Sequence, residues 1–338
     1  MKSTAKLEQQ LTQPSPRLIH DMSQLDGDLL ILGAGGKMGP SLAVLAKRAI
    51  AAAGLGHRVV AVSRFSADKT RRSLEEQGVE TIAADLLTPE AVSCLPEVPN
   101  VIYMAGQKFG TDGSEAITWA QNTWAPGLVA HRYRAARIVV FSTGNVYPLR
   151  PLGVGGADED TAPAPIGEYA QSCLGRERIF EYGSRRYNTP VLQYRLNYAM
   201  DLRYGVLVDI ARMVKENRPV DLAMGTINVI WQGDANEYAL RCLQLCRTPP
   251  AILNVTGPEL VSVRWLAKQF GQAFGTEPLF SGTEGPDALI SNASRCHGLL
   301  GYPHVSLRTM IDWTVQWIEA RGETLDKPTH FQERKGRY

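Results

Sequence analysis

Short apolar runs alternate with stretches of helical periodicity along the first two thirds of the chain. The apolar runs, typical of strands buried on both faces of a parallel sheet, cover residues 28–32, 57–62, 79–84, 101–106, 138–141 and 191–198. Helical patterns fill the intervals, among them residues 40–53, 114–134 and 168–180. Strands that alternate with helices predict an α/β fold built on a Rossmann-type, doubly wound, mostly parallel sheet.

The first strand leads directly into a glycine-rich turn. Residues 28–32 are followed by Gly33-Ala34-Gly35-Gly36-Lys37-Met38-Gly39, and a helical pattern opens at Pro40. Strand, glycine turn and helix form the context in which a glycine motif predicts dinucleotide binding. Glycines let backbone N–H groups approach a pyrophosphate, and the helix N-terminus adds partial positive charge. The predicted phosphate-binding residues are Gly33, Gly36, Lys37, Met38 and Gly39.

The end of the second strand indicates which dinucleotide is bound. An acidic residue there holds the ribose 2′-OH of NAD, whereas an arginine accommodates the 2′-phosphate of NADP. The chain has no acid at this point and reads Ser63-Arg64, and a guanidinium is a good phosphate partner. The alternative is a solvated basic helix start, which accounts for Arg71 and Arg72. We predict NADP, bound by Ser63 and Arg64, with NAD as the alternative.

Two further strand ends carry candidate cofactor contacts. Asp85 can accept a hydrogen bond from the adenine amino group while Leu86 packs on the ring, although an N-cap role for Asp85 is the alternative. Thr88 fills that cap position better, because Pro and Glu follow it. The small residues Ala105 and Gly106 end the fourth strand and leave room for the cofactor.

The chain divides into four regions by pattern. Residues 1–26, rich in Gln, Ser, Lys and Pro, are expected to form an N-terminal arm that packs on the core or on a partner subunit. Residues 27–200 form the predicted dinucleotide-binding domain. Shorter strands between helices predict a smaller C-terminal substrate lobe over residues 201–325, from which the chain can cross back. Residues 326–338 are a polar and aromatic tail without periodicity.

Composition excludes several classes of function. The 338 residues are 44% hydrophobic and carry a net charge of +2, which gives no reason to expect nucleic acid or a membrane as a partner. No apolar run is long enough to span a bilayer. The five cysteines lack metal-ligand spacing, so no metal site is predicted. An odd cysteine count without a signal peptide predicts a reducing, cytoplasmic setting.

The motifs, in this order and spacing, resemble an extended short-chain dehydrogenase/reductase of the NAD(P)-dependent epimerase/dehydratase family. The matching pieces, which span roughly residues 27–318, are Gly33-x-x-Gly36-x-x-Gly39, Asp85-Leu86, Met104-Ala105-Gly106, Asn122, Thr143-Gly144-Asn145-Val146-Tyr147, Tyr169 with Glu177, Arg195-Leu196-Asn197-Tyr198, Ile230-Trp231-Gln232-Gly233-Asp234 and Asn254-Val255-Thr256-Gly257. The resemblance implies hydride transfer at a substrate carbinol or ketone, with Tyr169 as acid/base and Thr143 holding the same oxygen. It also adds Asn122 and Asn197 to the cofactor site. A homodimer that pairs the helices at residues 114–134 and 168–187 is implied as well.

One position departs from the family pattern. A lysine normally follows the tyrosine by four residues, lowers the pKa of its phenol and holds the nicotinamide ribose, but this chain has Cys173 there. A phenol titrates near pH ~10, and a thiol supplies no positive charge to lower that value. Lys108 or Arg176 can replace the missing cation, or Tyr169 can act only as a neutral donor. In a third interpretation catalysis is lost and only cofactor binding remains.

The predicted substrate is small. The family's nucleotide-sugar enzymes usually carry diphosphate-binding arginines in two segments that correspond to residues 225–229 and 284–287, and neither segment contains arginine here. We therefore expect an NAD(P)-dependent oxidoreductase or epimerase for a small polyhydroxy or keto substrate, such as a sugar or sugar acid. The alternatives are an NADP-binding sensor or scaffold without turnover, and a nucleotide-sugar epimerase or dehydratase.

Overall fold

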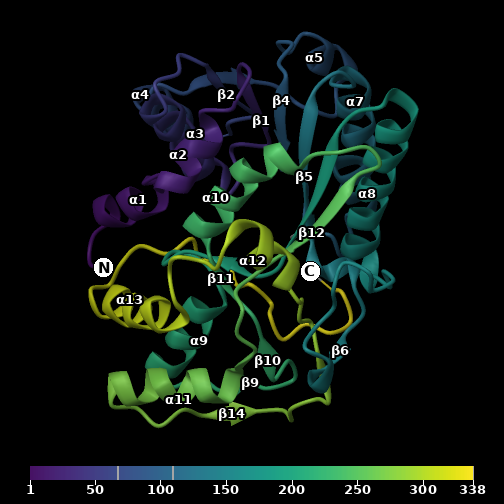
Figure 1. The fold of residues 1–338 in the computed structure, drawn as a ribbon. Coiled ribbons are helices and arrows are strands. Elements are labelled where there is room, and N and C mark those ends of the chain that lie inside the picture. The colour runs from purple at the N-terminus through teal and green to yellow at the C-terminus, as the bar shows by residue number, and fades with distance from the viewer. Residues whose placement is uncertain (67, 109, 338) are drawn as a thin grey trace.

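A seven-stranded, wholly parallel sheet forms the centre of the molecule. The computed structural model describes residues 1–66, 68–108 and 110–337. The strand order is β12-β7-β5-β4-β1-β2-β3 (Figure 1). The seven strands are β1 (Leu29–Leu32), β2 (Val59–Ser63), β3 (Glu80–Ala83), β4 (Asn100–Tyr103), β5 (Arg137–Thr143), β7 (Val191–Leu196) and β12 (Ala251–Val255). The predicted doubly wound α/β fold is confirmed, and the order changes direction between β1 and β4.

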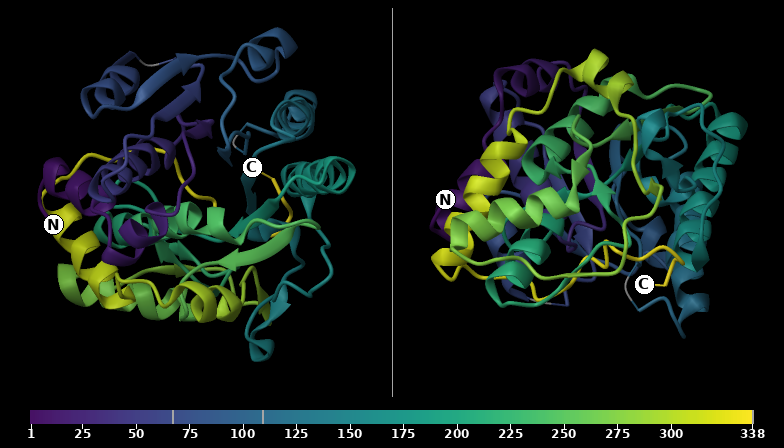
Figure 2. Two further views of the ribbon diagram at one scale, coloured as in Figure 1. Left: turned by 45° about the horizontal axis from the view of Figure 1, so that its top comes forward. Right: turned by 90° about the horizontal axis from the view of Figure 1, so that it is seen from below.

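Helices cover both faces of this sheet (Figures 1 and 2). In β1, Leu29 and Ile31 pack in the cluster that contains α3 and α10, whereas Leu30 and Leu32 pack in the cluster that contains α7 and α8. Burial on both sides explains why the strands read as continuous apolar runs. The helices around the sheet are α3 (Gly39–Ala52), α4 (Asp68–Glu76), α5 (Pro89–Ser93), α7 (Ala125–Arg132), α8 (Gly167–Tyr187), α10 (Gln232–Arg241) and α12 (Ser294–Leu300), with 3₁₀ turns η2 (Gly144–Val146), η3 (Leu152–Val154) and η4 (Cys242–Leu245).

The helical pattern predicted for residues 114–134 is interrupted by a π-helical turn. It consists of α6 (Glu115–Trp119), the π turn η1 (Ala120–Trp124) and α7. Such turns frequently occur at functional sites. This one contains Asn122, which is fully buried.

The N-terminal arm is helical and packs on the core. It forms α1 (Thr4–Thr12) and α2 (Pro16–Met22), whose first turns are capped by the hydroxyls of Ser3 and Ser15. The apolar positions are buried, with Leu7 in the substrate lobe's core and Leu18 in the core beneath the sheet. The arm therefore contacts both parts of the chain.

The predicted substrate lobe, called the substrate lobe below, has its own hydrophobic core. Its main helices are α9 (Val206–Lys215), α11 (Val263–Phe274) and α13 (Leu307–Glu319). Two pairs of two-residue strands join it to the sheet domain, namely β6 (Arg150–Pro151) with β15 (Asp287–Ala288) and β8 (Ala199–Met200) with β11 (Ile230–Trp231). Two further pairs lie within the lobe, β9 (Val220–Asp221) with β14 (Phe280–Ser281) and β10 (Thr226–Ile227) with β13 (Val261–Ser262). The chain also crosses back, because α10 packs on α3 and β12 extends the central sheet.

The C-terminal tail returns across the substrate lobe to the start of α8 (Figure 2). Thr329 donates two hydrogen bonds to the Asp209 carboxylate, both 2.7 Å long. Phe331 is buried, and Gly336 packs directly against Gly167. Two glycines are needed at this contact, since a Cβ on either would collide with the backbone of the other segment.

Among the described residues, the structure contains no helix with the length and apolar character required to cross a membrane.

Candidate active site

The glycine loop joins β1 to α3 at the carboxyl edge of the sheet. Gly33 has φ +92°, and a Cβ there would lie 2.5 Å from the backbone of Ala105. A Cβ on Gly39 would collide with the Ala34 carbonyl group. Gly36 is exposed, a Cβ there would lie 3.6 Å from the Gly33 carbonyl oxygen without a collision, and α3 begins after Met38 without a side-chain cap. Exposed backbone beside uncapped helix N–H groups fits a pyrophosphate, so these residues fit the predicted dinucleotide.

The end of β2 lies beside this loop. Gly35 packs so closely on Ser63 that a side chain on Gly35 would collide with the Ser63 hydroxyl. Arg71 and Arg72 form helical ion pairs with Glu75 and Asp68. Arg64 is exposed, and no ion pair to it occurs within residues 1–66, 68–108 and 110–337. The charge of Arg64 is therefore available at this end of the loop.

Asp85 stabilises the turn that follows β3. Its carboxylate accepts a hydrogen bond of 3.0 Å from the Leu87 N–H, and its backbone carbonyl accepts one from Thr88. Leu86 is buried in the sheet core, and α5 starts after Thr88. Asp85 is therefore not the cap of α5, and its contact with adenine remains a prediction.

Thr143 and Tyr169 meet where β5 ends and α8 begins. The Tyr169 phenol hydrogen-bonds with the Thr143 hydroxyl and with the Cys173 thiol. Thr143 Oγ1 also accepts hydrogen bonds from the Asn145 N–H at 3.2 Å and its Nδ2 at 2.9 Å. Burial holds the pKa of Tyr169 well above its usual range, whereas the nearby charge of Arg176 lowers it. Burial likewise raises the pKa of Cys173, so this residue is a packed thiol rather than a thiolate.

Lys108 approaches this pair from a different element. It follows β4, and its Nζ lies 5.6 Å from the centre of the Tyr169 ring. Burial lowers the pKa of Lys108 to about 8. Asn122 fixes the preceding residue, because its amide accepts from the Gln107 N–H at 3.1 Å and donates to the Gln107 carbonyl at 3.0 Å. The π turn thus holds the lysine-bearing loop beside α8.

Arg176, the other candidate cation, lies beneath the site. Its guanidinium donates to the Phe141 carbonyl at 2.8 Å and to the Asn122 side chain. A Cβ on Gly106 would collide with its Nη2. Arg176 is 5% exposed, and its hydrogen bonds connect α8 to β5 and to the π turn. Its position indicates a structural role with an electrostatic effect on Tyr169.

Two other motif positions form buried networks. Glu177 pairs with Arg195 at 2.7 Å, and Arg195 donates to the Tyr147 hydroxyl. The Asn197 side chain donates to Asn228 Oδ1 at 2.8 Å and lies near the Leu289 carbonyl. Asn197 therefore connects the sheet to loops of the substrate lobe, and its contact with the cofactor remains a prediction.

One contact in the site could not be predicted from spacing. Lys37 Nζ lies 3.1 Å from the centre of the Tyr204 ring, so the glycine loop reaches the substrate lobe. Tyr204 follows β8 in a segment without periodicity, and the only signal in the sequence was a lysine inside the glycine motif. Within the part of the chain that the structure describes, no group of three or more His, Cys, Asp or Glu residues could hold a metal ion.

Comparison with protein-family models matches residues 29–199 to the NAD dependent epimerase/dehydratase family. The chain belongs to this family. The matched segment contains the glycine loop, Thr143, Tyr169 and all sheet strands except β12. The family accounts for the dinucleotide fold, and it therefore supports a nicotinamide dinucleotide as cofactor.

Solved structures share the fold at low sequence identity. MoeE5 in complex with UDP-glucose and NAD has a TM-score of 0.71 at 19% identity, covering 87% of this chain and 99% of its own. UDP-glucuronic acid 4-epimerase from Bacillus cereus, in complex with NAD, has a TM-score of 0.72 at 18% identity, covering 86% and 98%. UDP-glucose 4-epimerase from Thermus thermophilus, in complex with NAD, has a TM-score of 0.70 at 21% identity, covering 87% and 99%. Comparison with curated protein sequences found no match.

Proposed function

We propose that the protein is an NAD(P)-dependent oxidoreductase or epimerase that acts by hydride transfer on a small polyhydroxy or keto substrate. The observation that carries this proposal is the hydrogen-bonded pair of Thr143 and Tyr169 at the sheet edge that also holds the glycine loop. Ligands of doubly wound sheets bind at this edge. A protein that only bound the dinucleotide would not need a phenol and a hydroxyl aimed at one another.

The two hydroxyl groups have different roles in this proposal. A bound nicotinamide ring supplies or accepts the hydride. Tyr169 gives a proton to the substrate oxygen or takes one from it, and Thr143 holds the same oxygen through its hydroxyl. Because burial raises the pKa of the Tyr169 phenol, the phenol needs a nearby cation to act as a base near neutral pH.

We assign Lys108 as the cation that acts on the Tyr169 phenol. Its ammonium group lies beside the Tyr169 ring and interacts electrostatically with Cys173, the residue at the family's lysine position. The guanidinium of Arg176 contributes positive charge from below, but its Nη atoms are engaged with Phe141 and Asn122. The lysine's role is thus supplied by the loop after β4 rather than by α8.

NADP is the cofactor that we favour, with NAD as the alternative. The exposed Arg64 at the end of β2 supports a 2′-phosphate contact. The similar structures named above contain NAD, and this observation favours the alternative.

Two other functions have an observation in their favour. Cys173 at the lysine position favours a cofactor-binding sensor or scaffold that has lost turnover. The structures of similar fold that bind UDP-glucose or UDP-glucuronic acid favour a nucleotide-sugar epimerase.

A homodimer completes the proposal. Ile117, Trp124 and Tyr182, on the helices that the resemblance pairs across subunits, are 42%, 53% and 64% exposed. Large exposed apolar side chains on neighbouring helices are typical of an interface. Sedimentation velocity of the full chain tests it, and a monomer at micromolar concentration would contradict it.

The decisive experiment mixes the protein with NADPH or NADH and a panel of keto-sugars, sugar acids and nucleotide sugars. We expect Tyr169→Phe to lower kcat by about 100-fold or more without weakening cofactor binding, which is measured by fluorescence. Tyr302→Phe is the matched control, because Tyr302 is 69% exposed and lies between α12 and α13, outside the site and the helices of the proposed dimer. Turnover that survives Tyr169→Phe unchanged would overturn the mechanism.

A further inference from the structure

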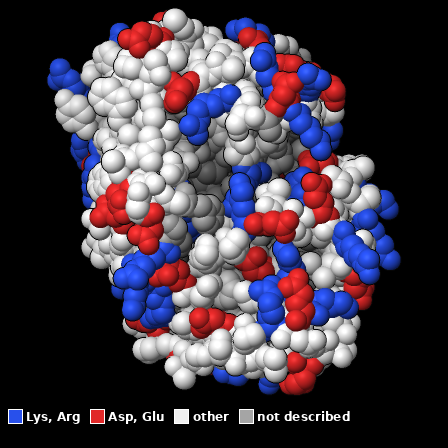
Figure 3. All heavy atoms as spheres, turned by 180° about the vertical axis from the view of Figure 1, so that it is seen from behind, with Lys and Arg blue, Asp and Glu red and all other residues white. Residues whose placement is uncertain are grey.

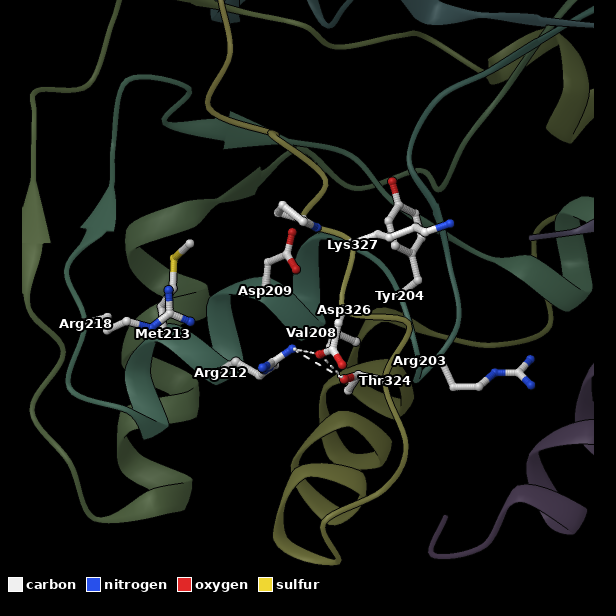
Figure 4. Close-up of a pocket in the computed structure, with 11 residues that line it drawn as sticks. Arg203, Tyr204, Val208, Asp209, Arg212, Met213, Arg218, Thr324, Asp326 and Lys327 are labelled. Carbon is white, nitrogen blue, oxygen red and sulfur yellow. Dashed lines mark hydrogen bonds and ion pairs between the residues drawn. The ribbon is translucent and has the colours of Figure 1, made fainter. Parts of the chain in front are cut away.

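Three lysines from distant parts of the chain converge between the glycine loop and the substrate lobe. Lys37 belongs to the glycine loop, Lys108 to the loop after β4, and Lys327 to the C-terminal tail. Lys37 Nζ lies over the Tyr204 ring. Tyr204 and Lys327 line one cavity of about 310 Å³ (Figure 4). The positive charges therefore extend from Tyr169 to this cavity.

The charges of Lys108 and Lys327 act on Lys37. Burial, followed by the charges of Lys108 and Lys327, lowers the pKa of Lys37 to about 7. Asp209 and Asp201 oppose this shift, and both carboxylates also accept hydrogen bonds. Asp209 accepts two from Thr329, and Asp201 Oδ2 accepts two from the Arg203 guanidinium at 2.6 and 3.0 Å. Figure 3 shows basic side chains at the rim of a hollow on the face opposite to Figure 1.

Lys327 is held in place by the tail around it. Thr329 fastens the following turn to α9, and Arg334 donates to the Ala223 and Asp287 carbonyl groups at 3.0 Å each. Arg334 also pairs with the Asp287 carboxylate. A fastened segment keeps the Lys327 charge near Lys37, although like charges repel. Basic side chains gathered from three segments in this way are typical of a binding site for an anion.

We propose that Lys37 and Lys327 bind an anionic group of the substrate, with Lys108 adding positive charge at the inner end beside Tyr169. The substrate is then a sugar acid or a sugar phosphate rather than a neutral sugar. This inference rests on the proposed function, and it adds the class of substrate. The carboxylate or phosphate is bound between the glycine loop and the tail while the carbinol or ketone faces Tyr169.

Calorimetric titration of the NADP-saturated full chain tests this. The probes are D-gluconate and 6-phospho-D-gluconate, and neutral D-glucitol is the uncharged control. We expect both anions to bind at least about 10-fold more tightly than D-glucitol. Lys327→Gln is expected to remove most of that difference and leave NADP affinity unchanged. Lys335→Gln, an exposed lysine of the same tail, is the control and is expected to change neither. Equal binding of anions and D-glucitol, or no effect of Lys327→Gln, would overturn the proposal.

Proton uptake gives a second readout. A bound anion raises the pKa of Lys37 from about 7, so binding at pH 8 takes up protons. Titrations in two buffers of different ionisation enthalpy measure this uptake, and Lys37→Gln is expected to lose it. Uptake that is unchanged in Lys37→Gln would contradict the assignment of Lys37.

A titration without cofactor shows whether the anion that the lysines bind belongs to the substrate or to the cofactor. Inorganic pyrophosphate is titrated into the free protein and into Lys327→Gln. Pyrophosphate binding that depends on Lys327 and is abolished by NADP would assign the lysines to the cofactor and overturn the proposal. If NADP binds normally but the anions do not, only this inference fails. If neither NADP nor NAD binds, the proposed function fails, and the sugar anions titrated into the free protein still decide the role of Lys327.

Discussion

Lys108 Nζ lies 5.6 Å from the centre of the Tyr169 ring, on a loop that faces the first turn of α8. The helix itself provides only the neutral thiol of Cys173 at the position one turn after Tyr169. Positive charge near the phenol therefore comes from two directions, from Lys108 across the site and from Arg176 two turns along α8, whose charge lowers the pKa of Tyr169. A side chain from a loop can fill this role only if the loop is held, and the hydrogen bonds between Asn122 and Gln107 hold it.

Lys108→Met is expected to lower kcat by about 10- to 100-fold, because the phenol loses the charge that stabilises its ionised form. The double variant Lys108→Met/Cys173→Lys is expected to recover part of the loss. Burial lowers the pKa of Lys108 to about 8, so the Lys108-dependent part of kcat is expected to fall as pH rises through 8. Stopped-flow rates from pH 6 to 10 measure both effects. Identical profiles for Lys108→Met and the unaltered protein would refute the assignment.

Arg64→Ala is expected to weaken NADP binding about 10- to 150-fold and to leave NAD binding unchanged, since a charge-assisted contact to the 2′-phosphate contributes about 1.5–3 kcal/mol. Arg72→Ala is the matched control, because Arg72 is also exposed but pairs with Asp68. Fluorescence titration with both cofactors measures the ratio. An equal loss of affinity for NAD and NADP would show that Arg64 contacts a part of the dinucleotide that both cofactors share.

The sheet could be predicted from the sequence because its strands are buried on both faces and separated by helices of regular periodicity. The same reasoning identified the glycine loop, where Gly33 and Gly39 lie against backbone atoms. The N-terminal arm was not predicted to be helical. Its helices are short, and short helices are stabilised by packing and by caps such as Ser15 rather than by propensity.

The site was less predictable than the fold for a related reason. Thr143 and Tyr169 belong to local motifs, whereas the contact between Lys37 and Tyr204 joins segments far apart in the chain. Neither periodicity nor spacing encodes such a contact. Arg176 illustrates the same limit, because its burial beneath Gly106 depends on how closely β4 approaches α8.

Gly33→Ala is expected to destabilise the protein by about 2 kcal/mol or more and to weaken dinucleotide binding. An alanine there would have to keep a φ of +92°, which is strained for any residue with a Cβ, and its Cβ would collide with the Ala105 backbone. Gly127→Ala is the contrasting variant, because it lies in α7 with no atom within 4 Å of the added carbon. It is expected to raise stability by about 0.5–1 kcal/mol. Urea unfolding measures both, and a neutral Gly33→Ala would show that the loop can rearrange.

Glu177→Gln is expected to lower the free energy of unfolding by about 3–5 kcal/mol, because it leaves the charge of Arg195 buried without its partner. The pair lies 2.7 Å apart, and the two side chains are 0% and 2% exposed. Glu181→Gln on the same helix is the control, since Glu181 pairs with the exposed Arg178 and Arg185 and its loss is expected to cost less than about 1 kcal/mol. The double variant Glu177→Leu/Arg195→Met removes both charges and is expected to recover much of the stability. Urea unfolding of the four proteins measures the difference, and equal losses for Glu177→Gln and Glu181→Gln would show that water reaches Arg195.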